Sequence, residues 1–487
     1  MTNCRLIIKD EVNIKFEGLS VEIRRKIANR LKYEVPYARH MPHYKLGRWD
    51  GTVSFFGTGG TGYLNHLDII IKILEDHDID IDDIADLRES HNFNFQTITE
   101  NYWADQGKVW PEGHRFAGDP IILRDYQLEA INQFMTNPQG LQELATGAGK
   151  TIITATLSAL CEPYGRTIVV VPNKSLVVQT EEDYKNVGLD VGVYFGDRKE
   201  LGHTHTIVTW QSLNVLDKKR LDQNDEALID LINDVVCVII DEVHQAKAEV
   251  LKKLLTQNFS RVPIRWGLTG TVPKQDFEYQ SLLSSIGPVI NRIAAHELQE
   301  KGILSQCHVN IVQLLDTREF KNYQEELKYL VSDKDRLNYI SNLCNQIKES
   351  GNTLILVDRI AAGELLTEAI PDSVFISGEI KLNERKEHYD EIKTSDKKVI
   401  VATYGVAAVG INIPRIFNLV LLEPGKSFVR VIQSIGRGIR KAEDKDFVQI
   451  WDITSTCKYA KRHLGERKKF YKDAKYPFSI EKANWQT

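Results

Sequence analysis

Short apolar runs recur along the chain and indicate where its sheets lie. Runs this continuous are typical of strands buried on both faces, as in parallel sheets covered by helices. The predicted buried strands fall into one set before residue 300 and a second set after it: residues 167–171, 206–209, 235–240, 352–357, 398–402 and 418–422. The sequence therefore predicts an α/β fold with two parallel-sheet domains.

The first ninety residues have a shorter and more mixed pattern. Residues 5–8 and 12–16 are predicted to be strands. Ser20 can cap a following helix that carries Ile23 and Ile27 on one side. This combination predicts a small α+β domain ahead of the two sheets.

Composition narrows the class of protein. The chain has 487 residues, of which 42% are hydrophobic and 26% charged, and this length is enough for roughly three domains. A net charge of −5 does not predict a nucleic-acid partner, so such binding must come from local basic patches. Six scattered cysteines without a Cys-x-x-Cys pair are typical of reduced thiols. Since no apolar run approaches ~18 residues and no signal peptide is visible, we expect a soluble cytoplasmic protein without a membrane partner.

One glycine-rich run carries the strongest chemical signal: Thr146-Gly147-Ala148-Gly149-Lys150-Thr151. It precedes a helical run, which is the setting of a loop whose backbone N–H groups close around phosphate. In such a loop Lys150 reaches the β- and γ-phosphates of a nucleotide and Thr151 binds Mg²⁺. The general pattern has glycine where Leu144 stands, and the alternative interpretation is a glycine-containing helix cap.

The apolar run 235–240 ends in Asp241-Glu242-Val243-His244. Two carboxylates at the end of a strand complement a phosphate loop. Asp241 is expected to bind Mg²⁺ through water, and Glu242 is expected to orient or deprotonate the attacking water. The alternative is an exposed strand end.

Basic and aromatic residues are interleaved between residues 37 and 56. Cations for phosphates beside flat rings for bases are typical of surfaces that follow a nucleic-acid strand. The alternative is a solvated hairpin with aromatic residues in its core. The candidate nucleic-acid contacts are Arg39, Lys45, Arg48 and Trp49.

Two other glycine-containing runs are not interpreted as nucleotide sites. Residues 57–62 satisfy Gly-x-Gly-x-x-Gly, but the acidic stretch after them contains no buried return strand. Residues 425–427 end like a phosphate loop but lack its glycine-rich approach. Both runs are predicted to be turns or loops.

The glycine-rich run and Asp241-Glu242-Val243-His244 together resemble motifs I and II of superfamily 2 helicases. The resemblance implies ATP in the loop at residues 146–151 and adenine on Gln127, which lies in a matching upstream element. It places motif III, which couples the nucleotide to the nucleic acid, at residues 268–271. It also implies nucleic-acid contacts from motifs Ia and Ib, at Pro172, Asn173, Lys174, Thr209, Trp210 and Gln211.

The second predicted sheet domain carries further motifs of the same family. Residues 403–414 resemble motif V, with Thr403 as a nucleic-acid contact and Asn412 where the family often has aspartate. Residues 433–440 resemble motif VI, whose permanently charged arginines act on the γ-phosphate. The candidate catalytic residues here are Gln433, Arg437 and Arg440.

A narrower resemblance lies near the N-terminus. Residues 44–51 resemble the accessory domain of UvsW-type phage helicases, which remodel branched DNA. The basic residues between 458 and 476 predict a helical tail lying on phosphates, or alternatively a solvated helix. The predicted parts are an accessory DNA-binding domain at residues 1–90, a linker at 91–120, two motor domains at 121–300 and 301–455, and the tail at 456–487.

The predicted function is that of an ATP-dependent DNA helicase or translocase. It would remodel forks, junctions and R-loops in phage recombination, repair and replication, as a monomer in the host cytoplasm. ATP and Mg²⁺ are its expected cofactors, and branched DNA is its expected partner, with RNA in RNA–DNA hybrids as a further one. The alternatives are an RNA helicase, a duplex translocase that does not unwind, and a nucleotide-gated clamp without turnover, against which Glu242 argues.

Overall fold

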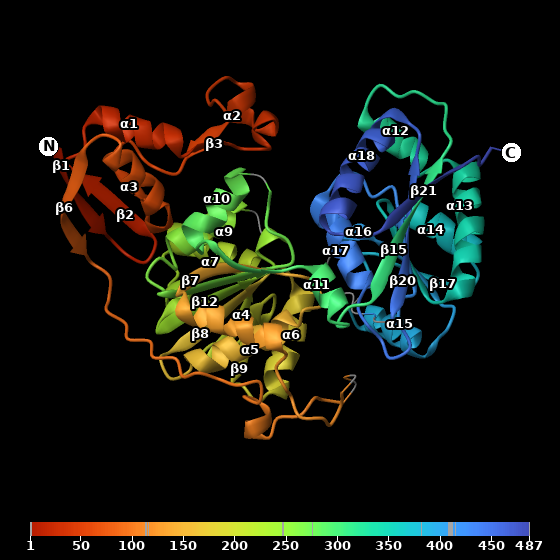
Figure 1. Cartoon of the computed structure of the whole chain (residues 1–487), viewed down its shortest axis with the longest axis horizontal. Helices are drawn as coiled ribbons and strands as arrows, with labels where there is room; N and C mark the ends of the chain where they lie inside the picture. The colour runs from red at the N-terminus through yellow and green to blue at the C-terminus, as the bar shows by residue number, and fades with distance from the viewer. Residues whose placement is uncertain are drawn as a thin grey trace. The chain divides into compact units, whose positions relative to one another are not determined.

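The computed structural model describes residues 2–112, 114, 116–245, 248–274, 276–380, 382–407, 413 and 415–486 (Figure 1). The chain divides into two compact units, of which the first comprises Met1–Leu144 and Gly149–Arg292 and the second Ala145–Ala148 and Ile293–Thr487. Each unit contains a largely parallel sheet, which confirms the predicted α/β class. Within the described residues, no helix is long and apolar enough to cross a membrane.

The N-terminal domain is a small sheet with helices packed on it. Its elements are β1 (Thr2–Ile8), β2 (Asn13–Glu17), α1 (Val21–Arg30), β3 (Lys32–Glu34), α2 (Pro42–Lys45), β4 (Thr52–Ser54), β5 (Thr61–Tyr63), α3 (Leu67–Glu75) and β6 (Ile79–Asp86). The sheet order is β5-β2-β1-β6, and β3 pairs separately with β4. Helix α1 begins where the Ser20 hydroxyl accepts a hydrogen bond from the backbone N–H of Ile23 (3.3 Å), as the sequence predicted.

The rest of the first unit is built on an eight-stranded sheet and is called the first sheet domain. Its strands are β7 (Gln139–Leu144), β8 (Arg166–Val171), β9 (Val191–Phe195), β10 (Arg198–Lys199), β11 (His205–Thr209), β12 (Val235–Asp241), β13 (Ile264–Thr269) and β14 (Val289–Ile293). Their order is β10-β9-β11-β8-β12-β13-β7-β14. The six strands from β9 to β7 in this order run parallel.

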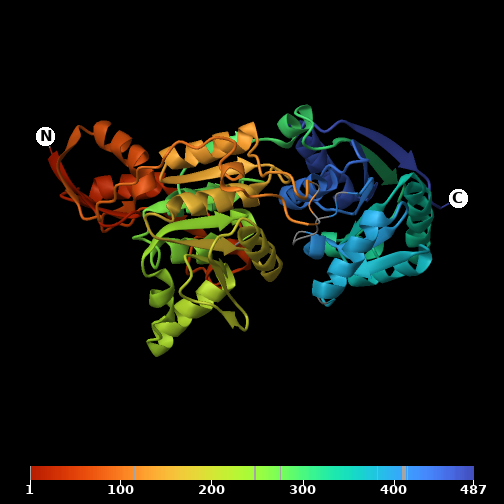
Figure 2. The same cartoon turned by 90° about the horizontal axis from the view of Figure 1, so that it is seen from below.

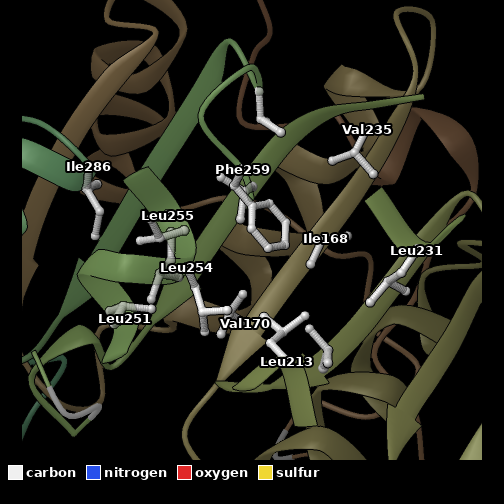
Figure 3. Close-up of a cluster of buried hydrophobic side chains, with 14 of the residues drawn as sticks. Ile168, Val170, Leu213, Leu231, Val235, Leu251, Leu254, Leu255, Phe259 and Ile286 are labelled. Carbon is white, nitrogen blue, oxygen red and sulfur yellow. The ribbon is translucent and has the colours of Figure 1, made fainter. Parts of the chain in front are cut away.

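Helices cover this sheet, and Figure 1 shows α4, α5 and α6 side by side on it. The helices of this domain are α4 (Asp125–Thr136), α5 (Lys150–Cys161), α6 (Lys174–Asn186), α7 (Trp210–Gln223), α8 (Ala227–Ile232), α9 (Ala248–Thr256) and α10 (Asp276–Ser285). Ile168 and Val170 of β8 pack with Leu213 of α7 and Leu254 of α9 in one buried cluster (Figure 3). This core fixes the strands whose ends carry the motifs.

The N-terminal domain packs against the first sheet domain within one unit (Figure 2). Phe277 of α10 belongs to the N-terminal core, and its ring centroid lies 6.1 Å from that of Phe55. The buried His66 side chain lies at hydrogen-bond distance from Gln280, with 2.8 Å between Nε2 and Oε1. The backbone N–H of Glu11 donates to a carbonyl of the sheet domain (3.0 Å). The two domains therefore share a continuous packed interior.

The segment predicted as a linker is also packed on the first sheet domain. Trp103, which is 1% exposed, donates from its indole N–H to the Thr156 hydroxyl of α5 (2.9 Å). The Phe95 ring lies 6.1 Å from that of Trp266 on β13. Aromatic side chains thus attach this segment to α5, the helix that follows the phosphate loop, and to β13.

The second unit is built on a seven-stranded sheet and is called the second sheet domain. Its strands are β15 (Gln306–Leu314), β16 (Thr353–Val357), β17 (Ser373–Ile376), β18 (Val399–Thr403), β19 (Asn418–Leu422), β20 (Phe447–Ser455) and β21 (Phe478–Ala483). Its helices are α11 (Ala295–Glu300), α12 (Tyr323–Leu330), α13 (Lys334–Ile347), α14 (Ile360–Ala369), α15 (Leu382–Thr394), α16 (Tyr404–Ala407), α17 (Phe428–Gly438) and α18 (Lys458–Asp473). All paired strands in the order β17-β18-β16-β19-β20-β15-β21 are parallel.

Residues 456–487, predicted as a basic tail, contribute α18 and β21 to the second sheet domain. Arg467 of α18 is 1% exposed and forms two hydrogen bonds with Asp452 of β20 (2.8 and 2.9 Å). Tyr471, also buried, donates to the same carboxylate (2.7 Å). Strand β21 extends the sheet beside β15. The helix was predicted, but one of its basic residues is an interior partner of a carboxylate.

Candidate nucleotide-binding site

The motifs of the first sheet domain gather at one edge because parallel strands end on the same side of a sheet. Strand β7 leads into the phosphate loop, β12 ends at Asp241, and β13 ends at Thr269. These three strands are neighbours, in the order β12-β13-β7. Strands β8 and β11, which carry motifs Ia and Ib, lie side by side next to β12. The topology therefore separates a nucleotide region from an adjoining nucleic-acid region.

The phosphate loop requires glycine for two reasons. Gly149 has a φ of +79°, in the left-handed region that L side chains rarely adopt. A Cβ at Gly149 would also lie 2.5 Å from the amide nitrogen of Gln127. The Gln127 side chain is buried and accepts from the backbone N–H of Arg124 (2.9 Å). The structure thus brings the residue expected to contact adenine directly beside the loop.

Lys150 is held at the base of the loop by two partners. Its ammonium donates to the carbonyl of Leu144 (3.3 Å) and lies 3.2 Å from a carboxylate oxygen of Glu242. The Glu242 backbone N–H donates to the Asp241 carboxylate (2.9 Å). Burial and the neighbouring Glu242 raise the pKa of Asp241 to about 7, although Lys150 opposes this. Two carboxylates therefore face one ammonium group in a largely desolvated place.

The residues expected to bind Mg²⁺ fit that ion. The Thr151 hydroxyl and the Asp241 carboxylate are oxygen donors, which Mg²⁺ prefers. Burial and the negative charge of Glu242 raise the pKa of Asp241, and a divalent cation would offset both by stabilising the ionised carboxylate. The residues present are thus chemically compatible with Mg²⁺.

Motifs II and III are joined by polar contacts that the sequence analysis did not anticipate. His244 Nδ1 lies 2.6 Å from the Thr269 hydroxyl and 3.5 Å from a Glu242 oxygen. The backbone N–H of Gly270 donates to Glu242 (3.4 Å). Glu242 itself has a φ of +51°, a strained value for a non-glycine residue. His244 and Thr269 lay in recognised motifs, but only the adjacency of β12 and β13 shows that they meet.

The polar side chains of motifs Ia and Ib have structural partners. Asn173 caps α6 by accepting from the Leu176 N–H (3.0 Å), and Thr209 caps α7 by accepting from the Ser212 N–H (3.2 Å). Gln211 donates to the Pro172 carbonyl (2.9 Å), which links the two motifs. The remaining candidates are an exposed Lys174 and a partly exposed Trp210.

The N-terminal candidates divide into two kinds. Arg39, Lys45 and Arg48 are exposed. Trp49 is partly buried against the N-terminal core, and its indole N–H donates to the Thr52 carbonyl (2.7 Å). These contacts favour the core alternative for Trp49 and leave the three cations as candidate phosphate contacts.

The second sheet domain carries the motif V and VI residues. Gln433 and Arg437 lie four residues apart on α17, and Arg440 follows the end of this helix. The helix begins at the Ser427 cap, which accepts from the Arg430 N–H (3.3 Å). Thr403 ends β18, whereas Asn412 lies outside the described residues.

The chain matches known helicase families in both sheet domains. The family "Type III restriction enzyme, res subunit" matches residues 120–274, and "Helicase conserved C-terminal domain" matches residues 335–442. The ATP-dependent DNA helicase uvsW of Enterobacteria phage T4 is 21% identical over 90% of this chain and 88% of its own length. The DNA 3'-5' helicase XPB of Kineococcus radiotolerans is 25% identical over 78% of this chain and 68% of its own. The fold of this chain is shared by S. cerevisiae Dbp5 bound to RNA and ADP BeF3, with a TM-score of 0.53, 15% identity, and coverage of 75% of this chain and 91% of Dbp5.

These matches and the paired parallel sheets define the chain as an ATP-dependent helicase of superfamily 2. Within this superfamily, the chain belongs with the DNA helicases and translocases. The predicted resemblance to UvsW-type phage helicases is confirmed.

Proposed function

We propose that the chain couples ATP hydrolysis to the unwinding or remodelling of branched DNA. The observation that carries the proposal is the buried ion pair between Lys150 and Glu242 beside Asp241, where a cation and phosphates are expected. The match to the phage T4 helicase over most of both chains supports DNA as the substrate, and the resemblance of residues 44–51 to the accessory domain of UvsW-type helicases supports the choice of branched DNA. We propose that the N-terminal 90 residues are the accessory domain that selects this DNA.

The first sheet domain carries the phosphate chemistry of the proposed mechanism. Backbone N–H groups of residues 146–151 bind the phosphates, and Lys150 contacts the β- and γ-phosphate oxygens. Thr151 and Asp241 would hold Mg²⁺, which would supply positive charge beside those oxygens. Because Lys150 then has phosphate partners, Glu242 is released to orient the attacking water and accept its proton. The Lys150–Glu242 pair is thus the resting arrangement of two groups that separate when ATP binds.

The second sheet domain contributes the positive charge that stabilises the transition state. Arg437 and Arg440 contact the γ-phosphate, with Gln433 beside them, when the two sheet domains close on ATP. Closing and reopening move one nucleic-acid surface relative to the other, since motifs Ia and Ib lie in the first domain and Thr403 lies in the second. Hydrolysis is therefore gated by a domain movement.

Two comparisons test this function on the full chain. ATPase stimulation by DNA and RNA of matched sequence separates a DNA helicase from an RNA helicase. Unwinding of forks, four-way junctions, R-loops and tailed duplexes separates remodelling of branched DNA from simple translocation. We expect DNA to stimulate more and branched substrates to be unwound faster. Equal unwinding of tailed duplexes and junctions would refute the branched-DNA assignment.

The variant Glu242→Gln tests the catalytic assignment. It removes the carboxylate but keeps the shape of the side chain, so ATP and DNA binding should persist while turnover is lost. A nucleotide-gated clamp without turnover would hydrolyse little ATP even as the wild type. Normal steady-state turnover in the Glu242→Gln protein would exclude the general-base role.

A further inference from the structure

Lys445 is a buried lysine that donates hydrogen bonds to two backbone carbonyls. Lys445 is 1% exposed, and lysine is rarely buried to this extent. The ammonium group donates to the carbonyl of Gly438 (2.5 Å) and to that of Arg440 (2.8 Å). Gly438 is the last residue of α17. The lysine therefore binds the C-terminal end of the helix that carries the motif VI arginines.

A positively charged donor at this position is favourable because it lies at the C-terminal end of a helix. The last carbonyl groups of a helix have no partners within the helix, and the aligned peptide dipoles make this end partly negative. A buried ammonium group satisfies such carbonyls and offsets that charge. Arg437 lies in the last turn of α17, and Arg440 lies two residues beyond it. Lys445 thus binds the backbone directly beside both arginines.

The same turn is fixed from a second direction. The backbone N–H of Ser305 donates to the carbonyl of Ile439 (2.8 Å), and Leu304 pairs with Arg440 in an isolated β-bridge. The Ser305 hydroxyl donates in turn to the Lys445 carbonyl (3.3 Å). The backbone of residues 438–440 is therefore held between the Lys445 ammonium and the segment at residues 304–305.

Burial makes the positive charge of Lys445 costly. Desolvation and the positive charge of Arg440 lower the pKa of Lys445 to about 7, and Asp444 opposes this shift. An apolar side chain of similar length would fill the same space without losing hydration. A lysine at this position is therefore better explained by what its ammonium group binds than by packing.

We infer that Lys445 is a positioning residue that orients Arg437 and Arg440 by binding the carbonyls of Gly438 and Arg440. The inference rests on the proposed action of these two arginines on the γ-phosphate. Lys445 does not itself touch the nucleotide in this scheme. It fixes the backbone path of residues 438–440 at the end of α17, and thereby the direction in which the two arginine side chains extend.

The test uses the variant Lys445→Met in the full chain, which keeps the length of the side chain and removes its donors. Affinity for ADP alone is compared with affinity for ADP plus aluminium fluoride, which mimics the transferred phosphate. Lys441→Met is the matched control, because Lys441 lies four positions away, pairs with Asp446 (3.2 Å) and donates to the Gly302 carbonyl (3.1 Å), not to the carbonyls of Gly438 and Arg440. Both substitutions are repeated in a chain with Arg437→Ala and Arg440→Ala.

We expect Lys445→Met to weaken binding of ADP with aluminium fluoride by about 10- to 100-fold, the effect of misplacing a catalytic group by about 1 Å. ADP affinity should stay within about twofold, and kcat should fall with little change in KM. In the double-arginine background Lys445→Met should add no further loss. Lys441→Met should behave as the wild type.

Three results would overturn the inference. They are an unchanged affinity for ADP with aluminium fluoride, an equal loss of ADP affinity, or a defect that persists at full size without the arginines. If Lys445→Met does not fold, Lys445→Gln, which retains neutral N–H donors, replaces it with the opposite expectation: affinity for ADP with aluminium fluoride should stay close to that of the wild type, and a loss as large as that of the arginine variants would overturn the inference. If the arginine substitutions themselves have no effect, the proposed function fails, whereas an effect of the arginines without one of Lys445 refutes only this inference.

Discussion

His66 allows a quantitative test of how the N-terminal domain is attached to the first sheet domain. Its side chain is fully buried, 2.8 Å from Gln280 and with its ring 5.4 Å from that of Phe55. Burial lowers its pKa from 6.5 to about 4, the Gln280 contact opposes this, and Lys252 adds to it. The folded chain therefore favours neutral His66 at pH values where a solvated histidine is charged.

The size and sign of the effect follow from this pKa. Below pH 6.5 His66 binds a proton in the unfolded chain but stays neutral in the folded chain. The contribution of neutral His66 to folding stability is therefore complete above about pH 6.5 and is lost as the pH falls towards 4. A lowering of the pKa by about 2.5, at about 1.4 kcal/mol for each pKa unit, gives a loss of about 3.5 kcal/mol. A loss of this size is large beside typical stabilities of about 5–15 kcal/mol.

Unfolding of the full chain between pH 8 and pH 4.5 checks this prediction. The variant His66→Gln keeps a neutral polar side chain and cannot gain a proton, so its stability should fall less with pH than that of the wild type. Since other groups also titrate in this range, the quantity to compare is the difference between the two proteins. NMR titration of the His66 ring should show a pKa well below 6.5. Identical pH profiles for the two proteins, or an ordinary pKa, would refute the reasoning.

Three other predictions concern ATP and DNA. Lys150→Ala should abolish ATPase activity and spare DNA binding, because Lys150 contacts phosphates of ATP; retention of more than about a tenth of turnover would contradict the phosphate-loop assignment. Arg437→Ala or Arg440→Ala should reduce kcat by at most about 10³-fold while raising KM much less, and steady-state kinetics that show only a KM change would reassign the arginines to ground-state binding. Arg48→Ala should weaken branched-DNA binding and lower its salt slope by about one unit at unchanged melting temperature, whereas Trp49→Ala should lower the melting temperature and disturb all activities together. Weak DNA binding with normal melting in the Trp49 variant would instead restore a DNA-stacking role.

Local pattern was sufficient for the elements of the catalytic core. The apolar runs at residues 167–171 and 235–240 correspond to β8 and β12, because a strand buried on both faces must be apolar at successive positions. The phosphate loop and the acidic strand end were visible because their chemistry requires fixed residue types at fixed spacing. Side chains whose role depends on neighbours in sequence were therefore predictable.

Contacts between distant residues were not predictable in this way. Trp103 meets Thr156 across 53 positions, and His66 meets Gln280 across 214 positions. Neither pair is marked in the sequence by a periodic pattern or a motif, because each is a single contact that depends on how whole helices and strands pack. The predicted linker and the join between the N-terminal and first sheet domains are accordingly decided by the tertiary structure.

The basic residues between 458 and 476 show most clearly the difference between what the sequence predicts and what tertiary packing decides. The sequence predicted a basic helix from the residues between 458 and 476, where α18 spans Lys458–Asp473, and charge alone suggested phosphates as partners. The fold instead buries Arg467 against Asp452 of β20, because α18 packs on the sheet at that carboxylate. Lys445 likewise has no distinguishing feature in the sequence. Only the fold brings the carbonyls of Gly438 and Arg440 to its ammonium group. Sequence fixes the charge of a side chain, whereas its partner, and hence its effect, depends on where the backbone places that charge.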